Sequence, residues 1–107
     1  MEAPLRITLA WIAVIVLLGA AGPARADYDL VVKKNCLACH QVDKRKYGPN
    51  FKEIAAKYAD QKNAADVLAK KIRRGGSGVW GQDVMPPQPQ VSATEARTLA
   101  TYVLSVK

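Results

Sequence analysis

The amino-acid sequence predicts a single all-α domain made of four to five short helices. Apolar residues recur at helical spacing in several short segments, and capping sequences precede some of these segments. No segment alternates apolar and polar residues with the period of two that a half-buried strand requires. The chain has 107 residues, and this length suits one domain rather than a multidomain enzyme, an α/β barrel or a doubly wound sheet.

The N-terminal segment has the organisation of a secretion signal. Its apolar run, Ile7–Ala21, is about 15 residues long, whereas a bilayer-spanning helix needs roughly 20. Pro23 and the small-residue sequence Ala24-Arg25-Ala26 follow it, as at a signal cleavage site. We therefore expect residues 1–26 to be a cleaved secretion signal and residues 27–107 to form the exported domain. Retention of the apolar run as a membrane anchor is the alternative.

The charge balance indicates an anionic partner. The chain has 16 basic and 9 acidic residues, which gives a formal net charge of +7. Loss of Arg6, Arg25 and Glu2 with the signal lowers this charge from +7 to +6. Nucleic acid, an anionic membrane surface and an acidic protein would each suit such a surface. Export makes genomic nucleic acid an unsuitable partner, so the sequence favours acidic proteins.

The first two expected helices flank a polar segment. Asp29 is expected to begin the first helix, which carries Leu30–Val32 toward the cysteines. Residues 41–49 are polar and irregular, with Gly48-Pro49 as a turn. The sequence Asn50-Phe51-Lys52-Glu53 then indicates a capping box. Behind it, four residues form one apolar helix face: Phe51, Ile54, Ala55 and Tyr58.

Two more helices follow, separated by a long loop. Asn63 is expected to cap a helix whose inward residues are Ala65, Leu68, Ala69 and Ile72, and Gly75-Gly76 ends it. The glycine- and proline-rich stretch Gly75–Gln90 is expected to be loop. Ser92–Glu95 indicates a second capping box, and the inward residues behind it are Ala96, Leu99, Ala100 and Val103. Such short, alanine-rich helices bury little surface, so the core needs something large and apolar at its centre.

The pattern Cys36-Leu37-Ala38-Cys39-His40 is the main chemical motif of the chain. The spacing C-x-x-C-H is the attachment signature of c-type haem. Two thiols three positions apart on a helical turn face one side, where each can add to a vinyl group of the same porphyrin. The adjacent imidazole then lies beneath the iron as an axial ligand. We therefore expect one haem c, covalently bound through Cys36 and Cys39, with His40 as an iron ligand.

Three other interpretations of the two cysteines are a disulfide, a thioredoxin-like redox pair and a zinc site. A thioredoxin-like pair requires a βαβ unit, and the sequence predicts no strands. A zinc site requires a fourth ligand, and no cysteine or histidine besides Cys36, Cys39 and His40 follows Ala26. A structural disulfide leaves the adjacent histidine without a role. Haem attachment accounts for all three side chains together.

Met85 is the candidate for the second axial ligand. It is the one methionine in residues 27–107. Pro86 and Pro87 restrict φ and remove amide donors, which stiffens the chain after the sulfur. A methionine that only fills the core is the alternative.

Ligation by His40 and Met85 would determine the function. A thioether stabilises Fe(II) and raises the reduction potential relative to two histidines. Two occupied axial positions leave no open site for oxygen, peroxide or a substrate, so we expect an outer-sphere one-electron carrier and no enzyme. A haem enzyme or gas sensor, in which the methionine dissociates to open a site, is the alternative function.

Several motifs give the sequence a resemblance to a known family. They are the C-x-x-C-H motif, Tyr47-Gly48-Pro49, Gly78–Gly81, Met85-Pro86-Pro87 and the terminal segment Leu99–Ser105. Together they resemble the class I bacterial cytochromes c, and in particular the small c-551/c-552 type, over residues 27–107. The resemblance implies the class I cytochrome c fold, with its helices wrapped around one covalent haem.

The resemblance also implies a role and partners. Such proteins are periplasmic, monomeric electron carriers of the respiratory chain, and neither nucleic acid nor stable membrane insertion is expected. The implied donor is a redox protein such as a cytochrome bc complex. The implied acceptor is a nitrite reductase, such as the cytochrome cd type, or a terminal oxidase.

The resemblance further implies roles for residues around the haem. The Pro49 carbonyl is expected to accept a hydrogen bond from the His40 ring, and Trp80 is expected to donate its indole N–H to a haem propionate. Lys71 stands where relatives often have an arginine near the inner propionate. Gln88 stands near the place where some relatives have an asparagine that hydrogen-bonds the methionine sulfur.

Three further expectations concern backbone conformation and the surface. Asn35 precedes the first cysteine, where glycine is frequent in the family, and asparagine tolerates unusual φ values. Tyr102 is expected to face only Leu30 or Val31 where the first and last helices cross. Cations near the motif are expected to surround the exposed haem edge and to steer it toward acidic partners. These cations are Lys33, Lys34, Lys44, Arg45 and Lys46.

Overall fold

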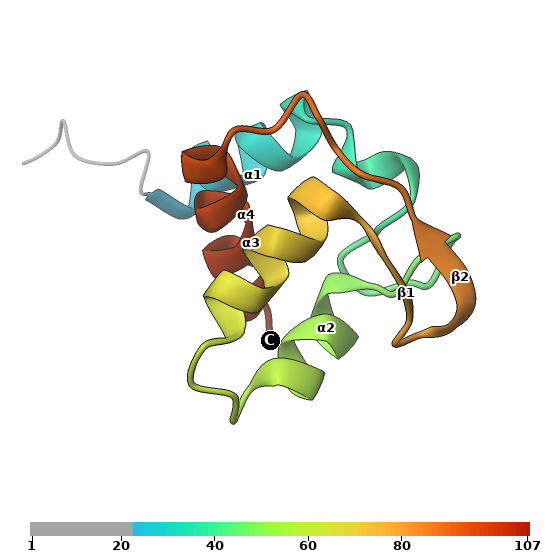
Figure 1. Cartoon of the computed structure of the whole chain (residues 1–107). Coiled ribbons are helices and arrows are strands. Elements are labelled where there is room, and N and C mark those ends of the chain that lie inside the picture. The colour runs from blue at the N-terminus through green and yellow to red at the C-terminus, as the bar shows by residue number, and fades with distance from the viewer. Residues whose placement is uncertain (1–22) are drawn as a thin grey trace, which may run out of the picture.

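The structure, a computed structural model, describes residues 23–107 and is mainly helical (Figure 1). The elements run in the order α1, η1, α2, α3, β1, β2 and α4, where η1 is a 3₁₀ helix. Their bounds are Pro23–Lys33, Cys36–Ala38, Phe51–Tyr58, Ala64–Arg74, Gly76–Gly78, Gly81–Met85 and Ala93–Ser105. No helix within the described part of the chain is long and apolar enough to cross a membrane.

The first helix begins earlier than the sequence predicts. α1 starts at Pro23, so Asp29 lies inside the helix, and the prediction that Asp29 begins it is wrong. Proline suits the first turn of a helix because its missing N–H would have no helical partner there. The apolar run and most of the expected secretion signal, residues 1–22, lie outside the described residues. Cleavage after Ala26 stays a prediction, and it would leave Asp27–Lys33 as the helix.

Both predicted capping boxes are present. In α2 the Asn50 side chain accepts a hydrogen bond from the Glu53 amide at 2.7 Å, and the Glu53 carboxylate accepts one from the Asn50 amide at 2.9 Å. The same reciprocal pair joins Ser92 and Glu95 at the start of α4, at 3.1 and 3.0 Å. The hydrogen bond from the Ser92 amide, together with the Lys34 ammonium, lowers the pKa of Glu95. Each box satisfies amides at a helix N-terminus that otherwise lack partners.

α3 begins where the sequence predicts but is capped differently. Asn63 is the N-cap residue, yet its side chain accepts a hydrogen bond from the Gln61 side chain at 3.1 Å and makes no bond to the helix. The buried residues of α3 are Ala64 and Leu68. Ala65, which the sequence predicts to point inward, is only half-buried. The face of α3 is therefore rotated slightly from the predicted one.

The segment that the sequence predicts to be loop, Gly75–Gln90, contains a two-stranded antiparallel sheet. Gly76 pairs with Met85 and Gly78 pairs with Gly81, with an irregular register between these pairs. The residues of β2 before Met85 are exposed. Such strands show no apolar–polar alternation, so the periodicity of the sequence does not predict them. The hairpin is small, and the fold is mostly helical, as predicted.

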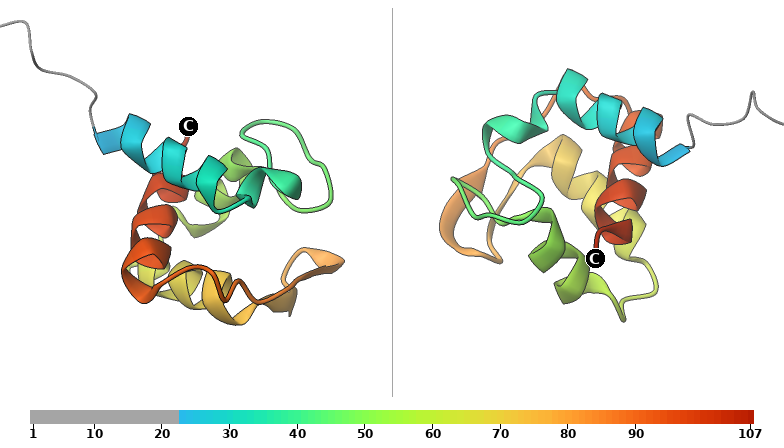
Figure 2. Two further views of the ribbon diagram at one scale, coloured as in Figure 1. Left: turned by 90° about the horizontal axis from the view of Figure 1, so that it is seen from above. Right: turned by 180° about the vertical axis from the view of Figure 1, so that it is seen from behind.

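The core lies where α4 crosses the other α-helices. α4 contacts α1, α2 and α3, and its predicted inward residues are buried. The buried apolar residues are Val31, Phe51, Ile54, Ala55, Tyr58, Ala64, Leu68, Val91, Ala96, Leu99, Ala100 and Val103. On the side away from the α1–α4 crossing, the loop before α2 and the β1–β2 hairpin stand opposite each other (Figure 2).

An aromatic cluster supports the crossing of α1 and α4. The centroid of the Tyr102 ring lies 6.1 Å from that of Tyr28 and 6.1 Å from that of Phe51. The prediction that Tyr102 faces only Leu30 or Val31 is therefore wrong, because Tyr28 supplies an aromatic partner from α1. Burial raises the pKa of the Tyr102 hydroxyl, and the nearby Tyr28 acts in the same direction.

Candidate functional site

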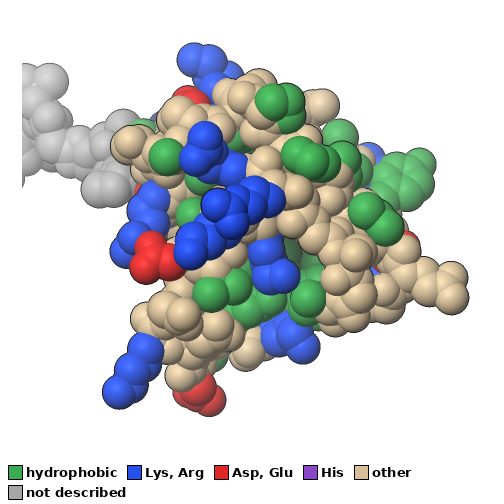
Figure 3. All heavy atoms as spheres, viewed as in Figure 1, with side chains coloured by type: hydrophobic (Ala, Val, Ile, Leu, Met, Phe, Trp, Pro, Cys, Tyr) green, Lys and Arg blue, Asp and Glu red, His purple; other side chains and the backbone are tan. Residues whose placement is uncertain are grey.

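A largely apolar cavity opens between the η1–α2 part of the chain and the α3–hairpin part. Its space, counted together with the solvent at its open mouth, is about 1310 Å³. Core residues of α4 form its floor. Figure 3 shows hydrophobic side chains in a hollow beside Lys and Arg side chains. The residues predicted to form the site all line this cavity: Cys36, Cys39, His40, Pro49, Trp80 and Met85.

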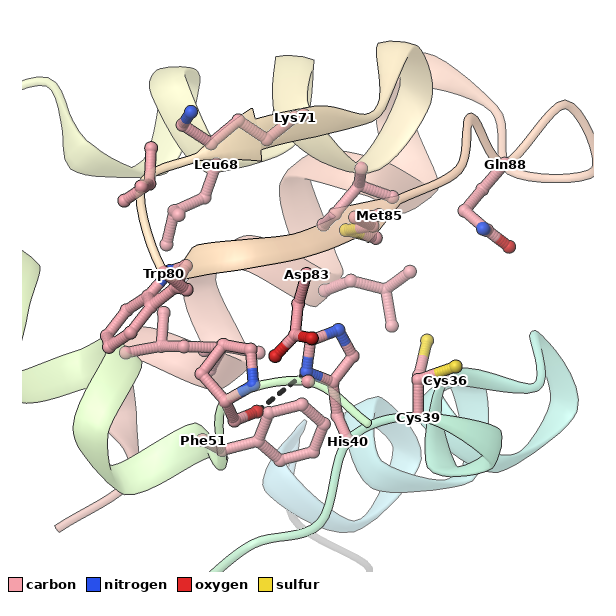
Figure 4. A pocket seen from close by; sticks show the side chains of 18 of the residues that line it. Cys36, Cys39, His40, Phe51, Leu68, Lys71, Trp80, Asp83, Met85 and Gln88 are labelled. Carbon is pink, nitrogen blue, oxygen red and sulfur yellow. Dashed lines mark hydrogen bonds between the residues drawn. The ribbon is translucent and has the colours of Figure 1, made fainter. Parts of the chain in front are cut away.

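His40 projects from one wall of the cavity, and its ring is held by the backbone (Figure 4). Its Nδ1 lies 2.7 Å from the Pro49 carbonyl oxygen. Because a carbonyl can only accept, Nδ1 carries the proton, and Nε2 of the neutral ring keeps its lone pair. The Phe51 ring stacks on the imidazole with 5.7 Å between centroids and 25° between planes. The predicted hydrogen bond between Pro49 and His40 is therefore present, and it prepares Nε2 to bind a metal.

Gly48, which the sequence predicts only as part of a turn, also leaves room for the His40 ring. A Cβ atom at this position would lie 2.9 Å from Cε1 and 3.1 Å from Nδ1 of His40. Any larger residue would therefore force the imidazole to shift. The sequence feature that could have revealed this is a glycine directly before the proline that holds the histidine.

The two cysteines flank a single tight turn beside His40. The Cys36 carbonyl accepts hydrogen bonds from the Cys39 amide at 3.2 Å and from the His40 amide at 3.0 Å. Asn35 begins this turn with a φ of 65°, as its tolerance for unusual φ values predicts. Both thiols are free, with Cys36 half-buried and Cys39 exposed. Burial raises the pKa of the Cys36 thiol, which disfavours the thiolate that a dithiol oxidoreductase needs.

Met85 lies on the opposite wall, at the end of β2, and a glycine lets the chain approach it closely. Gly75, which the sequence predicts only as the end of α3, has a φ of 77°. A Cβ atom there would lie 2.5 Å from the Met85 carbonyl oxygen and 2.9 Å from the Pro87 nitrogen. Gly75 therefore sets the distance between α3 and the strand that carries the thioether.

Three other residues of the cavity have defined surroundings. Trp80 is half-buried, and the Lys57 ammonium lies 5.4 Å from the centroid of its ring. Lys71 lines the cavity from α3. Gln88 donates a hydrogen bond to the Pro86 carbonyl at 2.9 Å. In this structure the Gln88 amide is thus engaged by the backbone next to Met85.

The donor set of the cavity fits a covalently bound haem. His40 and Met85 offer an imidazole nitrogen and a thioether sulfur from facing walls, and the two thiols stand at one edge (Figure 4). The lining between them is mostly hydrocarbon, which suits a flat apolar macrocycle. Among residues 23–107, His, Cys, Asp and Glu side chains form no group of three or more that could hold a metal ion.

Comparison with known proteins agrees with this fit. A sequence profile described as Cytochrome c matches residues 28–107. The chain is 55% identical over 87 residues to cytochrome c-552 of Nitrosomonas europaea, which covers 81% of this chain and 84% of that protein. It is 54% identical over 79 residues to cytochrome c-551 of Azotobacter vinelandii, which covers 74% of this chain and 95% of that protein.

The fold is shared with a solved relative. The crystal structure of wild-type Nitrosomonas europaea cytochrome c552 matches with a TM-score of 0.73 at 54% identity, covering 75% of this chain and 99% of that chain. Covalently bound haem c is the cofactor of these proteins, and this chain has two cysteines for its attachment, Cys36 and Cys39. The chain therefore belongs to the cytochrome c family, among the small class I cytochromes of the c-551/c-552 type.

Proposed function

We propose that the chain is an exported one-electron carrier in which His40 and Met85 are the axial ligands of haem c. As a cytochrome c related to the c-551 and c-552 proteins, the chain is a haem c electron carrier. Bound haem supplies reversible Fe(III)/Fe(II) chemistry.

The observation that carries the proposal is the position of His40 and Met85 on facing walls of one apolar cavity. The Pro49 carbonyl, 2.7 Å from Nδ1, holds the His40 ring with its Nε2 lone pair available. Strand β2 and the two prolines behind it hold the thioether. When both side chains act as ligands, no axial position is left for a substrate. The function then requires no acid, base or nucleophile from the chain.

The first test is the mass and the spectrum of the protein purified from the periplasm of a host that attaches haem c. The mass is expected to equal residues 27–107 plus one haem, because cleavage after Ala26 and attachment to both cysteines are proposed together. The oxidised protein should show a weak red charge-transfer band from methionine ligation. The reduced protein should be low-spin and bind carbon monoxide slowly at neutral pH, because Met85 occupies the site.

Two outcomes would contradict parts of this proposal. Rapid carbon monoxide binding to the reduced wild type would support the alternative, a haem enzyme or gas sensor with a displaceable Met85. A mass that still includes residues 1–26 would contradict the cleaved signal and favour a retained anchor.

Location and partners follow from the signal and the cavity mouth. The N-terminal apolar run and its cleavage sequence support export to the periplasm. There the partners would be redox proteins such as a cytochrome bc complex and a nitrite reductase or terminal oxidase. Tyr47 and Val84 line the cavity and are 70% and 69% exposed. They offer apolar contact where a partner approaches the haem edge.

Two of the cations expected to steer partners are held by carboxylates of the chain itself. Lys34 pairs with Glu95 at 3.1 Å, and Arg45 contacts Glu53 and Asp83. The steering hypothesis therefore rests on the exposed cations that enter none of the ion pairs found among residues 23–107. These cations are Lys33, Lys44 and Lys46.

The double substitution Lys44→Gln with Lys46→Gln is expected to slow electron transfer to an acidic partner. At low ionic strength we expect a decrease of about 3- to 10-fold, because local cations raise the rate of encounter. Stopped-flow reaction with a nitrite reductase would measure the rate as salt is added. Lys62→Gln with Lys107→Gln, which removes the same charge elsewhere, is the control. A wild-type rate that does not fall with ionic strength would contradict steering.

A further inference from the structure

Arg45 connects the two parts of the chain that carry the proposed ligands. It lies in the loop between His40 and α2, yet its guanidinium reaches the β1–β2 hairpin. Nη2 donates to the Asp83 carboxylate at 2.8 Å and to the Trp80 carbonyl at 3.4 Å. Nη1 donates to the Glu53 carboxylate at 3.4 Å. One planar cation thus joins α2 and the hairpin.

We propose that Arg45 is a positioning residue that holds the β1–β2 hairpin against the segment that carries His40, and so retains Met85 as an axial ligand. The contacts of Arg45 with Glu53, Asp83 and the Trp80 carbonyl are called the clasp below. The inference rests on the proposed function, because it concerns the ligand pair His40 and Met85. Arg45 acts through the hairpin backbone and through Asp83. It was expected to serve partner docking, and the structure assigns it this internal role.

On the side of His40, the clasp is tied to the capping box of α2. The Glu53 oxygen that accepts from Arg45 also accepts from the Asn50 amide at 2.9 Å in the capping box of α2. Pro49, whose carbonyl orients the His40 ring, immediately precedes Asn50. The guanidinium is therefore anchored to the same short segment that orients the histidine ligand.

The hairpin side is the part that the clasp restrains. Asp83 is two residues before Met85 in β2, lines the cavity, and projects toward the wall that carries His40 (Figure 4). A restraint on Asp83 therefore acts two residues away from the residue that carries the thioether. β2 itself is exposed before Met85, so little burial holds it in place.

Few other polar contacts hold the hairpin to the segment that carries His40. Within the described part of the chain, the hydrogen bonds between residues 76–85 and the chain before α3 are the two from Arg45. The cation–π contact of Lys57 with Trp80, at 5.4 Å, adds to them. The removal of Arg45 would therefore loosen the hairpin on the side that faces His40.

The clasp shifts the equilibrium of the hairpin toward the closed position by a modest factor. The side chains of Arg45, Glu53 and Asp83 are 45%, 36% and 51% exposed. Exposed ion pairs each shift an equilibrium by about 1.4- to 5-fold, and salt screens them. Opening of the hairpin breaks one such pair, Arg45–Asp83, and leaves the pair with Glu53 intact. We therefore predict a shift of about 2- to 5-fold between a closed hairpin, with Met85 bound, and an open one.

The test uses the oxidised holoprotein and imidazole, which competes with Met85 for its axial position. Arg45→Gln is expected to bind imidazole about 2- to 5-fold more tightly than the wild type, because the open hairpin is more populated. Loss of the methionine charge-transfer band measures the binding. High salt should shrink the difference between the two proteins, since it screens the wild-type clasp.

Three further variants separate the clasp from a general effect of charge. Lys44→Gln removes a neighbouring cation of the same loop and should leave imidazole affinity at the wild-type value. Arg45→Lys should restore part of the wild-type behaviour, because lysine can pair with one carboxylate but lacks the planar fork. Asp83→Asn should act in the same direction as Arg45→Gln, and the double variant should add little to either single one.

The possible failures are distinguishable. If Arg45→Gln and Lys44→Gln both bind imidazole like the wild type, the clasp is wrong while the ligand pair stands. The clasp is also wrong if Arg45→Gln only lowers the melting temperature without changing imidazole affinity. If the wild type itself lacks the methionine band, the proposed ligation fails before the clasp is tested.

Discussion

Replacement of Met85 by alanine is expected to lower the reduction potential and to make the reduced protein react rapidly with carbon monoxide. The thioether favours Fe(II), so its loss should lower the potential by on the order of 0.1 V, within the roughly 0.8 V that axial ligands span. The alanine side chain cannot reach the position that the sulfur would fill. Potentiometric titration and carbon monoxide mixing measure the two effects.

Val84→Ala is the matched control for this experiment. Val84 is adjacent to Met85, lies on the same strand and is 69% exposed. Its truncation should leave the potential and the methionine band nearly unchanged. An unchanged spectrum and potential in Met85→Ala would remove Met85 as a ligand. The protein would then need a different second ligand or an open site.

Replacement of Gly75 by alanine is expected to destabilise the protein and to weaken methionine ligation together. Gly75 has φ 77° and ψ −179°, a region essentially confined to glycine that costs about 1–3 kcal/mol for other residues. The new Cβ would also lie 2.5 Å from the Met85 carbonyl oxygen. We expect a loss of about 3 kcal/mol or more of the roughly 5–15 kcal/mol typical of a domain. Denaturant unfolding and the methionine band would report the two effects.

Gly78→Ala separates backbone strain from the steric clash. Gly78 also has a positive φ, 83°, but nothing lies within 4 Å of a Cβ built there. This variant should lose about 1–2 kcal/mol, the cost of a left-handed conformation for a residue with a Cβ atom, and should keep its methionine band. If Gly75→Ala proves no worse than Gly78→Ala in stability and ligation, close approach to Met85 is not what Gly75 provides.

Local sequence patterns predicted the starts of α2, α3 and α4. Both capping boxes depend on residues three positions apart, so Asn50 with Glu53 and Ser92 with Glu95 could be identified without a fold. The C-x-x-C-H motif likewise places its three side chains within one turn. Asp29 failed as a helix start because a proline further upstream could begin the helix as well.

Features that depend on contacts between distant segments were missed. Tyr28 meets Tyr102 only because α1 crosses α4. The β1–β2 hairpin is defined by backbone pairing among exposed glycine-rich residues and leaves no apolar pattern. Gly48 and Gly75 matter because of the atoms they approach, and glycine itself reveals only that no side chain is present.

The sequence by itself determined that this chain is built to hold haem c, because thiol and imidazole chemistry depends on residue identity. Only the tertiary structure decided how the hairpin that carries Met85 is held against the segment that carries His40. Arg45 and Asp83 are 38 positions apart in the chain, and no local pattern links them. The packing of α2, α3 and α4 brings their charges together across the cavity mouth. Such contacts arise from the relative placement of rigid elements, which local spacing does not specify.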